Sequence, residues 1–227
     1  LNEWNEYMIF NNPNRSAWEK TDEMIASLHI QPGERIADIG CGGGYFSWQF
    51  SKLVGEKGKV YATEINKDAI AYLEQFIADY GITNIETVVT RMNDAGLKAN
   101  SVDTVFMCSM YHAVYITNIE FVKDHFIDTV KKALRKNGRL IVVDNDIPAP
   151  GIPSYYGPGL VPEMIISQLH YYGFELESRI QLIPQRFALT FRMVDDSTTK
   201  NDPKKRAKYV ARIAGERLKK KQPPKPQ

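Results

Sequence analysis

The stretch Ala37-Asp-Ile-Gly-Cys-Gly-Gly-Gly44 places four glycines between a short apolar run and a helical pattern. The apolar run covers residues 35–40 and has the length of a buried strand, and residues 45–54 form a helical pattern that stops at Gly55. Glycine lets the backbone adopt positive φ values and approach a ligand closely. The stretch therefore predicts a ligand site at the carboxyl end of the first strand of an open sheet.

The alternation of strand and helix continues along the chain. Apolar runs predict four more strands, at residues 59–64, 85–89, 102–108 and 139–144. Asn66 and Gly81 are typical of the start and the end of a helix between them, and an amphipathic pattern from Ile119 to Leu134 predicts a longer helix that ends at Gly138. Strands that alternate with helices favour a parallel sheet covered by helices on both faces.

The two ends of the chain differ from this middle part. Ser16-Ala-Trp-Glu19 has the form of a capping box that begins an N-terminal helix. Residues 145–160 are rich in Pro, Gly and Tyr and form a loop too long for a simple connector. A helix from Pro162 to Gly173 and a hairpin of strands at 174–183 and 186–193 follow. We therefore expect a three-layer α/β sandwich with a mostly parallel seven-stranded sheet and an antiparallel C-terminal hairpin.

The composition is that of an ordinary soluble protein, since 43% of the 227 residues are hydrophobic and 25% are charged. No apolar run approaches the ~20 residues that a membrane-spanning helix needs. The net charge of +2 is unevenly divided, because residues 198–227 carry eleven Lys and Arg against two acids, which leaves the remainder at −7. We expect an N-terminal helical cap at 1–34, one α/β domain at 35–195 and a basic, partly disordered tail at 196–227.

Cysteine and histidine usage excludes several kinds of site. Cys41 and Cys108 are too few for a disulfide framework or a Cys-rich metal centre, and both lie in apolar segments where small buried residues are common. The histidines form no zinc pattern, so no metal is expected. A reduced compartment such as the cytoplasm is expected, with export after removal of a leader left open. Because the first and fourth strands are neighbours in such a sheet, a redox-sensitive Cys41–Cys108 pair is a further hypothesis.

The spacing of the glycines narrows the class of ligand. A dinucleotide fingerprint needs Gly-x-Gly-x-x-Gly, but Tyr45 stands at the third position of the frame that starts at Gly40, and Ser47 at that of the frame from Gly42. A phosphate-binding P-loop needs Gly-Lys-Ser/Thr, and the turn contains no lysine. A nicotinamide-dependent dehydrogenase is therefore the weakest of the alternatives.

The turn instead resembles the Asp-x-Gly-x-Gly-x-Gly signature of class I S-adenosylmethionine (SAM)-dependent methyltransferases. Asp38, Gly40, Gly42 and Gly44 occupy its positions, and Glu64 ends the second strand where that family has an acid. The resemblance covers roughly residues 15–195, and it extends to Ser101–Asp103, Met110–His112 and Lys136–Arg139. It implies a Rossmann-like fold, SAM as cofactor, and in-line (SN2) transfer of the methyl group to an acceptor.

The resemblance also implies roles for single residues. Asp38 would lie beneath the methionine moiety, Glu64 would accept hydrogen bonds from both ribose hydroxyls, and Ile65 would cover the adenine. Asn93 or Asp94, after the third strand, would contact the adenine edge. The cofactor-binding positions implied in this way are Asp38, Gly40, Cys41, Gly42, Gly44, Glu64, Ile65, Asn93 and Asp94.

Residues of the acceptor side are expected after the fourth and fifth strands. His112 is the preferred general base, because an unperturbed histidine has a pKa near ~6.5. Tyr111 is a second catalytic candidate or a wall of the cofactor pocket, and Asp144 is a candidate substrate contact. Tyr155 and Tyr156, in the Pro/Gly-rich loop, are candidates for a lid over the substrate.

Three functions stay open on these grounds. The first is a methyltransferase for a small molecule, because the domain is compact and carries no obvious recognition domain. The second is methylation of RNA or protein, with the basic tail attracting an anionic partner. The third is a protein that binds SAM without catalysis. The sequence assigns no oligomeric state.

Overall fold

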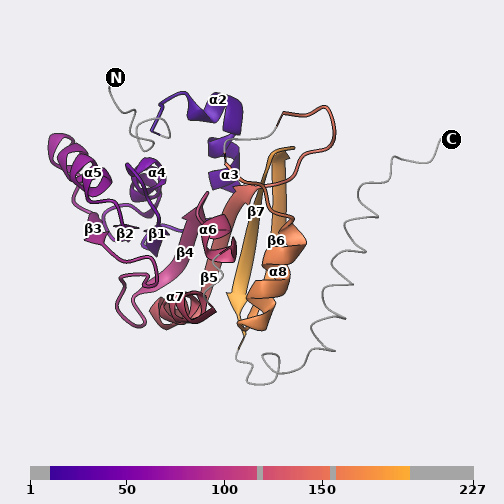
Figure 1. The fold of residues 1–227 in the computed structure, drawn as a ribbon. Coiled ribbons are helices and arrows are strands. Elements are labelled where there is room, and N and C mark those ends of the chain that lie inside the picture. Colours follow the sequence, from indigo (N-terminus) through magenta and orange to yellow (C-terminus); the bar gives the residue numbers. More distant parts are fainter. Residues whose placement is uncertain (1–10, 117–119, 154–156, 195–227) are drawn as a thin grey trace.

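The computed structural model describes residues 11–116, 120–153 and 157–194, and a seven-stranded sheet lies at its centre (Figure 1). The strand order is β3-β2-β1-β4-β5-β7-β6. The strands are β1 Arg35–Ile39, β2 Lys59–Glu64, β3 Ile85–Val89, β4 Val102–Cys108, β5 Leu134–Asn145, β6 Phe174–Ile183 and β7 Arg186–Met193. The pairs among β1 to β5 are parallel, and β7 is antiparallel to both β5 and β6, which confirms the expected sheet.

Helices cover both faces of the sheet, as the alternating pattern predicts. They are α2 Arg15–Glu19, α3 Thr21–Ser27, α4 Tyr45–Val54, α5 Lys67–Asp79, α6 Tyr111–Ile116, α7 Glu120–Ala133 and α8 Pro162–Tyr171. One core cluster joins the sheet to α3, α4 and α5, and the other joins it to α6, α7 and α8. In the first cluster the ring of Phe106 lies 5.0 Å from that of Phe46 and 4.8 Å from that of Phe50.

Strand order reverses between β1 and β4, which are paired with each other although two strands separate them in the chain. The connections that leave β1 and β4 therefore diverge to opposite sides, and a crevice opens at their carboxyl ends. The glycine turn follows β1 directly, so this topology places it in the crevice. Among the described residues, no helix combines the length and apolar character needed to cross a membrane.

Local signals for α5 act as expected. The Asn66 side chain accepts hydrogen bonds from the backbone N–H groups of Asp68 and Ala69 at 2.9 and 3.3 Å, which caps the helix. Gly81, with φ of 62°, follows its last turn. The helix of residues 45–54 and the hairpin of β6 and β7 also have the expected bounds.

Two expectations about helices were wrong. The capping box at Ser16–Glu19 does not form, because α2 already begins at Arg15 and Ser16 lies inside the helix. Lys20 takes a left-handed φ of 53° and separates α2 from α3. The Ser16 hydroxyl accepts a hydrogen bond from the N–H of Asp22, in α3, at 3.2 Å. Further along, α7 ends at Ala133 instead of at Gly138, because Leu134 already pairs with Val102 of β4.

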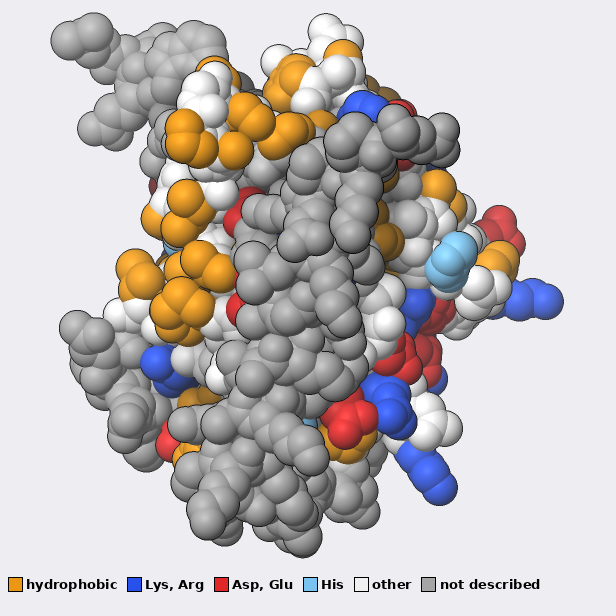
Figure 2. Space-filling view, turned by 90° about the vertical axis from the view of Figure 1, so that its right-hand side faces the viewer, with side chains coloured by type: hydrophobic (Ala, Val, Ile, Leu, Met, Phe, Trp, Pro, Cys, Tyr) orange, Lys and Arg blue, Asp and Glu red, His pale blue; other side chains and the backbone are white. Residues whose placement is uncertain are grey.

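The two edge strands of the sheet are β3 and β6. Figure 2 looks onto the right-hand side of Figure 1 and shows charged side chains gathered on one side of this face and hydrophobic ones on the other. On β6 the charged residues are Glu175, Glu177 and Arg179, and Glu175 pairs with Arg192 of β7 at 2.7 Å. Charge on an edge strand opposes pairing with a further strand. Tyr155, Tyr156, Ile119 and the basic tail lie outside the described residues.

A buried group of three charges fastens α2 to the sheet, and we call Arg15, Glu19 and Arg186 the charge triad. The Glu19 carboxylate pairs with both guanidinium groups, and its Oε1 lies 2.7 Å from Nε of Arg186. Arg186 also donates hydrogen bonds to Ser109, at the end of β4, and to Asn145, at the end of β5. The triad therefore holds α2 beside the carboxyl ends of β4 and β5.

We expect Glu19→Gln to lower the free energy of unfolding by about 3–5 kcal/mol, since it leaves two buried guanidinium charges without their shared carboxylate. Glu23→Gln is the matched control, because Glu23 has a 60% exposed side chain and pairs with Lys20 at 3.6 Å. Its loss should stay below about 1 kcal/mol. Urea unfolding of both variants measures the difference, and equal losses would contradict the assigned role of the triad.

Candidate active site

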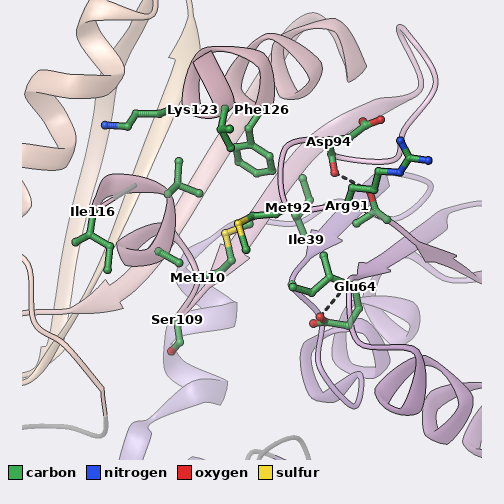
Figure 3. A pocket seen from close by; sticks show the side chains of 16 residues that line it. Ile39, Glu64, Arg91, Met92, Asp94, Ser109, Met110, Ile116, Lys123 and Phe126 are labelled. Atoms are coloured by element: carbon green, nitrogen blue, oxygen red, sulfur yellow. Dashed lines mark hydrogen bonds between the residues drawn. The ribbon is translucent and has the colours of Figure 1, made fainter. Parts of the chain in front are cut away.

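A cavity of about 430 Å³ opens at the carboxyl ends of the parallel strands (Figure 3). Its walls come from the segments that follow β1, β2, β3 and β4, and from α6 and α7. The lining residues are Ile39, Gly40, Glu64, Ile65, Thr90, Arg91, Met92, Asp94, Ser109, Met110, Ala113, Val114, Ile116, Val122, Lys123 and Phe126. This volume and mostly apolar lining are typical of small-ligand sites.

The glycine turn depends on the absence of side chains. Gly40, Gly42 and Gly44 have φ values of 71°, 52° and 86°, in the region that favours glycine. A Cβ atom on Gly44 would lie 2.4 Å from Cδ1 of Leu73, and one on Gly40 would lie 3.0 Å from Cγ of Met110. The turn therefore packs closely against α5, and its backbone borders the cavity.

Glu64 is held in one position by backbone donors. Its Oε2 accepts a hydrogen bond from the N–H of Gly42 at 3.0 Å, and its Oε1 accepts from the N–H groups of Ile65 and Asn66 at 2.7 and 3.0 Å. The carboxylate thus joins the end of β2 to the glycine turn. Because Glu64 also lines the cavity, these bonds aim a hydrogen-bond acceptor at whatever the cavity holds (Figure 3).

Asp38 lies buried at the start of the turn. The Ser47 hydroxyl, in α4, donates a hydrogen bond to its carboxylate at 2.6 Å. Burial raises the pKa of Asp38 to about 6; the Ser47 hydrogen bond lowers this pKa and the nearby Glu64 charge raises it. A carboxylate in this position would be stabilised by a cation placed next to it.

The predicted adenine contacts divide between the cavity and its surroundings. Ile65 lines the cavity and is 52% exposed, and Asp94 lines it as well. Asn93 is not among the lining residues. Met92 and Met110 also face the cavity, from the segments that follow β3 and β4 (Figure 3). The sequence assigned no role to either side chain. The only signal for such a role was their position shortly after a strand, which many residue types can occupy.

His112 and Asp144, two predicted acceptor-side residues, are brought together. Asp144 is fully buried at the end of β5 and accepts hydrogen bonds from the N–H of His112 at 2.9 Å and of Asn145 at 2.9 Å. Nδ1 of His112 lies 3.0 Å from Oδ1 of Asp144. Asp144 thus contacts His112 and does not line the cavity, and its role as a substrate contact stays a prediction.

Tyr111 lies elsewhere. Its side chain is fully buried in the core, its hydroxyl donates a hydrogen bond to Gln168 of α8 at 2.6 Å, and burial raises its pKa well above the usual value. This position argues against the expected role as a catalytic group or a wall of the pocket. The helical turn at α6 points Tyr111 toward α8, and periodicity alone did not show this.

Both cysteines are free thiols. Burial raises the pKa of Cys41 well above its usual value and raises that of Cys108. Neither thiol is therefore prone to form a nucleophilic thiolate. Sγ of Cys108 contacts Arg186 of the charge triad at 3.0 Å. Within the described ranges, no group of three or more His, Cys, Asp and Glu side chains is arranged to hold a metal ion.

The chain is similar in sequence to known methyltransferases. A family described as a methyltransferase domain matches residues 30–206. A Sulfurisphaera tokodaii protein named as a cobalt-precorrin-6B C(15)-methyltransferase (decarboxylating) is 30% identical over 120 residues, which cover 53% of this chain and 57% of that protein. The ubiquinone/menaquinone biosynthesis C-methyltransferase UbiE of Vibrio cholerae is 29% identical over 117 residues, which cover 50% of this chain and 42% of UbiE.

These matches span about half the length of the two curated relatives. The fold is also shared with a SAM-dependent methyltransferase from Aquifex aeolicus of known structure. That structure is similar with a TM-score of 0.71 and 21% identity, and the similarity covers 83% of this chain and 97% of that one. The sheet order, the glycine turn with Glu64 and the family match over residues 30–206 agree. The chain therefore belongs to the class I SAM-dependent methyltransferase family.

Proposed function

We propose that this chain binds SAM in the crevice and transfers its methyl group to a small-molecule acceptor. The observation that carries the proposal is the carboxylate of Glu64, which three backbone N–H groups hold at the edge of a cavity bordered by the glycine turn. SAM has a ribose diol, an adenine and a zwitterionic methionine end, but no phosphate. A cavity edged by a carboxylate and by bare backbone suits such a molecule better than it suits a nucleotide.

The residues around the cavity match the parts of SAM one by one. Glu64 accepts hydrogen bonds from the ribose hydroxyls, and such charge-assisted bonds contribute roughly 1.5–3 kcal/mol each. The exposed side chain of Ile65 covers one face of the adenine, and Asp94 contacts the edge of the adenine ring. Asp38 attracts the methionine ammonium group, directly or through water. SAM supplies a methyl group already activated on a sulfonium.

The acceptor side lies at the ends of β4 and β5, where His112 is the general base of the proposal. The names of the two relatives describe methylation of carbon atoms in small molecules, which supports a small-molecule acceptor here. A direct test incubates the chain with methyl-labelled SAM and a panel of small acceptors. Labelled product that forms together with demethylated SAM supports the proposal, and SAM binding with no turnover on any acceptor favours a non-catalytic role.

Methylation of RNA or protein is a second candidate, and it depends on the basic residues 198–227. Deletion of these residues separates the two possibilities. The affinity for SAM should be unchanged by the deletion under either candidate function. Salt-sensitive RNA binding that disappears with the tail would favour the second candidate.

We expect Glu64→Ala to weaken binding of SAM and of its demethylated product at least tenfold, because the ribose hydroxyls lose their acceptor and the Gly42 N–H loses its partner. Isothermal calorimetry measures the dissociation constants. Glu86→Ala is the matched control, since Glu86 lies on β3, has a 53% exposed side chain and pairs with Lys59 at 3.4 Å. Its affinity for SAM should equal that of the unmodified chain, and an equal loss in both variants would count against the proposal.

The raised pKa of Asp38 predicts a pH dependence. The pKa of this group is about 6 in the folded chain and has its ordinary value of 3.8 in the unfolded chain, so the stability of the ligand-free chain falls as the pH rises through this window. Only the ionised carboxylate attracts the SAM ammonium, so affinity for SAM should increase as the pH rises through about 6. Calorimetry at several pH values checks this. Asp38→Asn should remove this dependence, and a constant wild-type affinity would contradict the assigned role.

A further inference from the structure

We propose that Asp144 is a positioning residue that fixes the tautomer of His112, and that the acceptor is consequently a group that must lose a proton. The inference rests on the proposed methyl transfer and adds to it the chemical class of the acceptor. In this arrangement the Nδ1–H of His112 donates to Asp144, and the lone pair on Nε2 is left to take a proton. Hydroxyl groups, phenols, enols and acidic C–H groups belong to this class of acceptor.

The contacts of Asp144 support a carboxylate that accepts hydrogen bonds at both oxygen atoms and donates none. Three donors converge on it: the backbone N–H and Nδ1 of His112, and the backbone N–H of Asn145. The two backbone donors approach different oxygen atoms, Oδ2 and Oδ1, so both oxygens are acceptors. Nδ1 shares Oδ1 and is therefore best placed as the protonated nitrogen. Full burial of Asp144 leaves no solvent to compete for these bonds.

The position of the pair fits the acceptor side of the crevice. His112 stands in the first turn of α6, two residues after Met110, which lines the cavity. Asp144 stands one residue after Val143, which pairs with Cys108 at the end of β4. The imidazole side chain is 18% exposed and contacts Asp144 through Nδ1. His112 itself does not line the cavity, whereas its neighbours Met110 and Ala113 do. The charge triad contacts Ser109 and Asn145, the residues next to this pair.

In the proposed reaction one bond breaks in the acceptor and one breaks in SAM. The acceptor O–H or C–H bond breaks, its proton goes to Nε2 of His112, and its electron pair forms the new bond to the methyl carbon. The electron pair of the broken carbon–sulfur bond stays on sulfur, which leaves as a neutral thioether. His112 ends as an imidazolium whose charge faces the Asp144 carboxylate, and Asp144 itself takes no proton.

Asp144→Ala removes both acceptor oxygens, so nothing holds the ring proton of His112 on Nδ1. A neutral imidazole without such a partner favours the Nε2–H tautomer. The Nε2 lone pair needed by the acceptor is then lost. Asp103→Ala is the matched control, since Asp103 lies near the start of β4, at the opposite end of the sheet, and pairs with Arg135.

The experiment is long-range ¹H–¹⁵N NMR of the full chain labelled at its four histidines, with His112 assigned by His112→Gln. It is recorded at about pH 8, above the usual titration of histidine. We expect the Nδ1–H tautomer in the unmodified chain and in Asp103→Ala, and a shift to Nε2–H in Asp144→Ala. An Nε2–H tautomer in the unmodified chain would overturn the proposal even if the Asp144 variant did not fold.

Turnover tests the acceptor class with the same variants. Asp144→Ala should lower methylation of phenols or acidic carbon compounds by about 10²–10⁴-fold, the usual contribution of a general base. Its affinity for SAM, measured by calorimetry, should stay within twofold of the unmodified chain. Methylation restricted to tertiary amines or thioethers, which need no base, would overturn the inference. Failure of the unmodified chain to bind SAM would instead reject the proposed function itself.

Discussion

The hydrogen bond from the Gly42 N–H to the carboxylate of Glu64 connects the two segments on which the site depends. It joins the turn after β1 to the end of β2, and it requires a backbone free of side chains on one side and a carboxylate on the other. The positive φ values of Gly40, Gly42 and Gly44 bring the N–H within reach. The N–H groups of Gly40 and Cys41 donate to the carbonyl of Thr63 at 2.8 and 3.1 Å, so backbone hydrogen bonds fix the same turn to β2.

Buried charge gathers around this contact at the carboxyl end of the sheet. Asp38, Asp144 and the charge triad are all buried there, and each has partners that reduce the cost of burial. Glu19 pairs with two arginines, Asp144 accepts hydrogen bonds from two backbone N–H groups, and Asp38 has one hydroxyl donor together with a raised pKa. Asp38 is the least compensated of them, which fits a group whose partner arrives with a ligand. Strong perturbation of this kind is typical of functional sites.

Much of the fold could be predicted because its signals are local. The positive φ values of the glycines at 40, 42, 44 and 81 and the cap at Asn66 are local features, so they can be recognised in the sequence. The N-terminal helix expected after a capping box at Ser16–Glu19 was wrong, because Ser16 lies inside α2. The pattern also does not reveal that Glu19 pairs with Arg186, more than 160 residues later in the chain.

The chain's sequence by itself determined the order of strands and helices, the ligand turn and the carboxylate opposite it, because repeating apolar positions and glycine conformations are properties of short segments. Only the tertiary structure shows where the residues predicted for the acceptor side lie. Tyr111 lies in the core, Asp144 contacts His112, and the charge triad joins α2 to β7. Those contacts join residues far apart in the chain, and their geometry follows from how the strand ends meet.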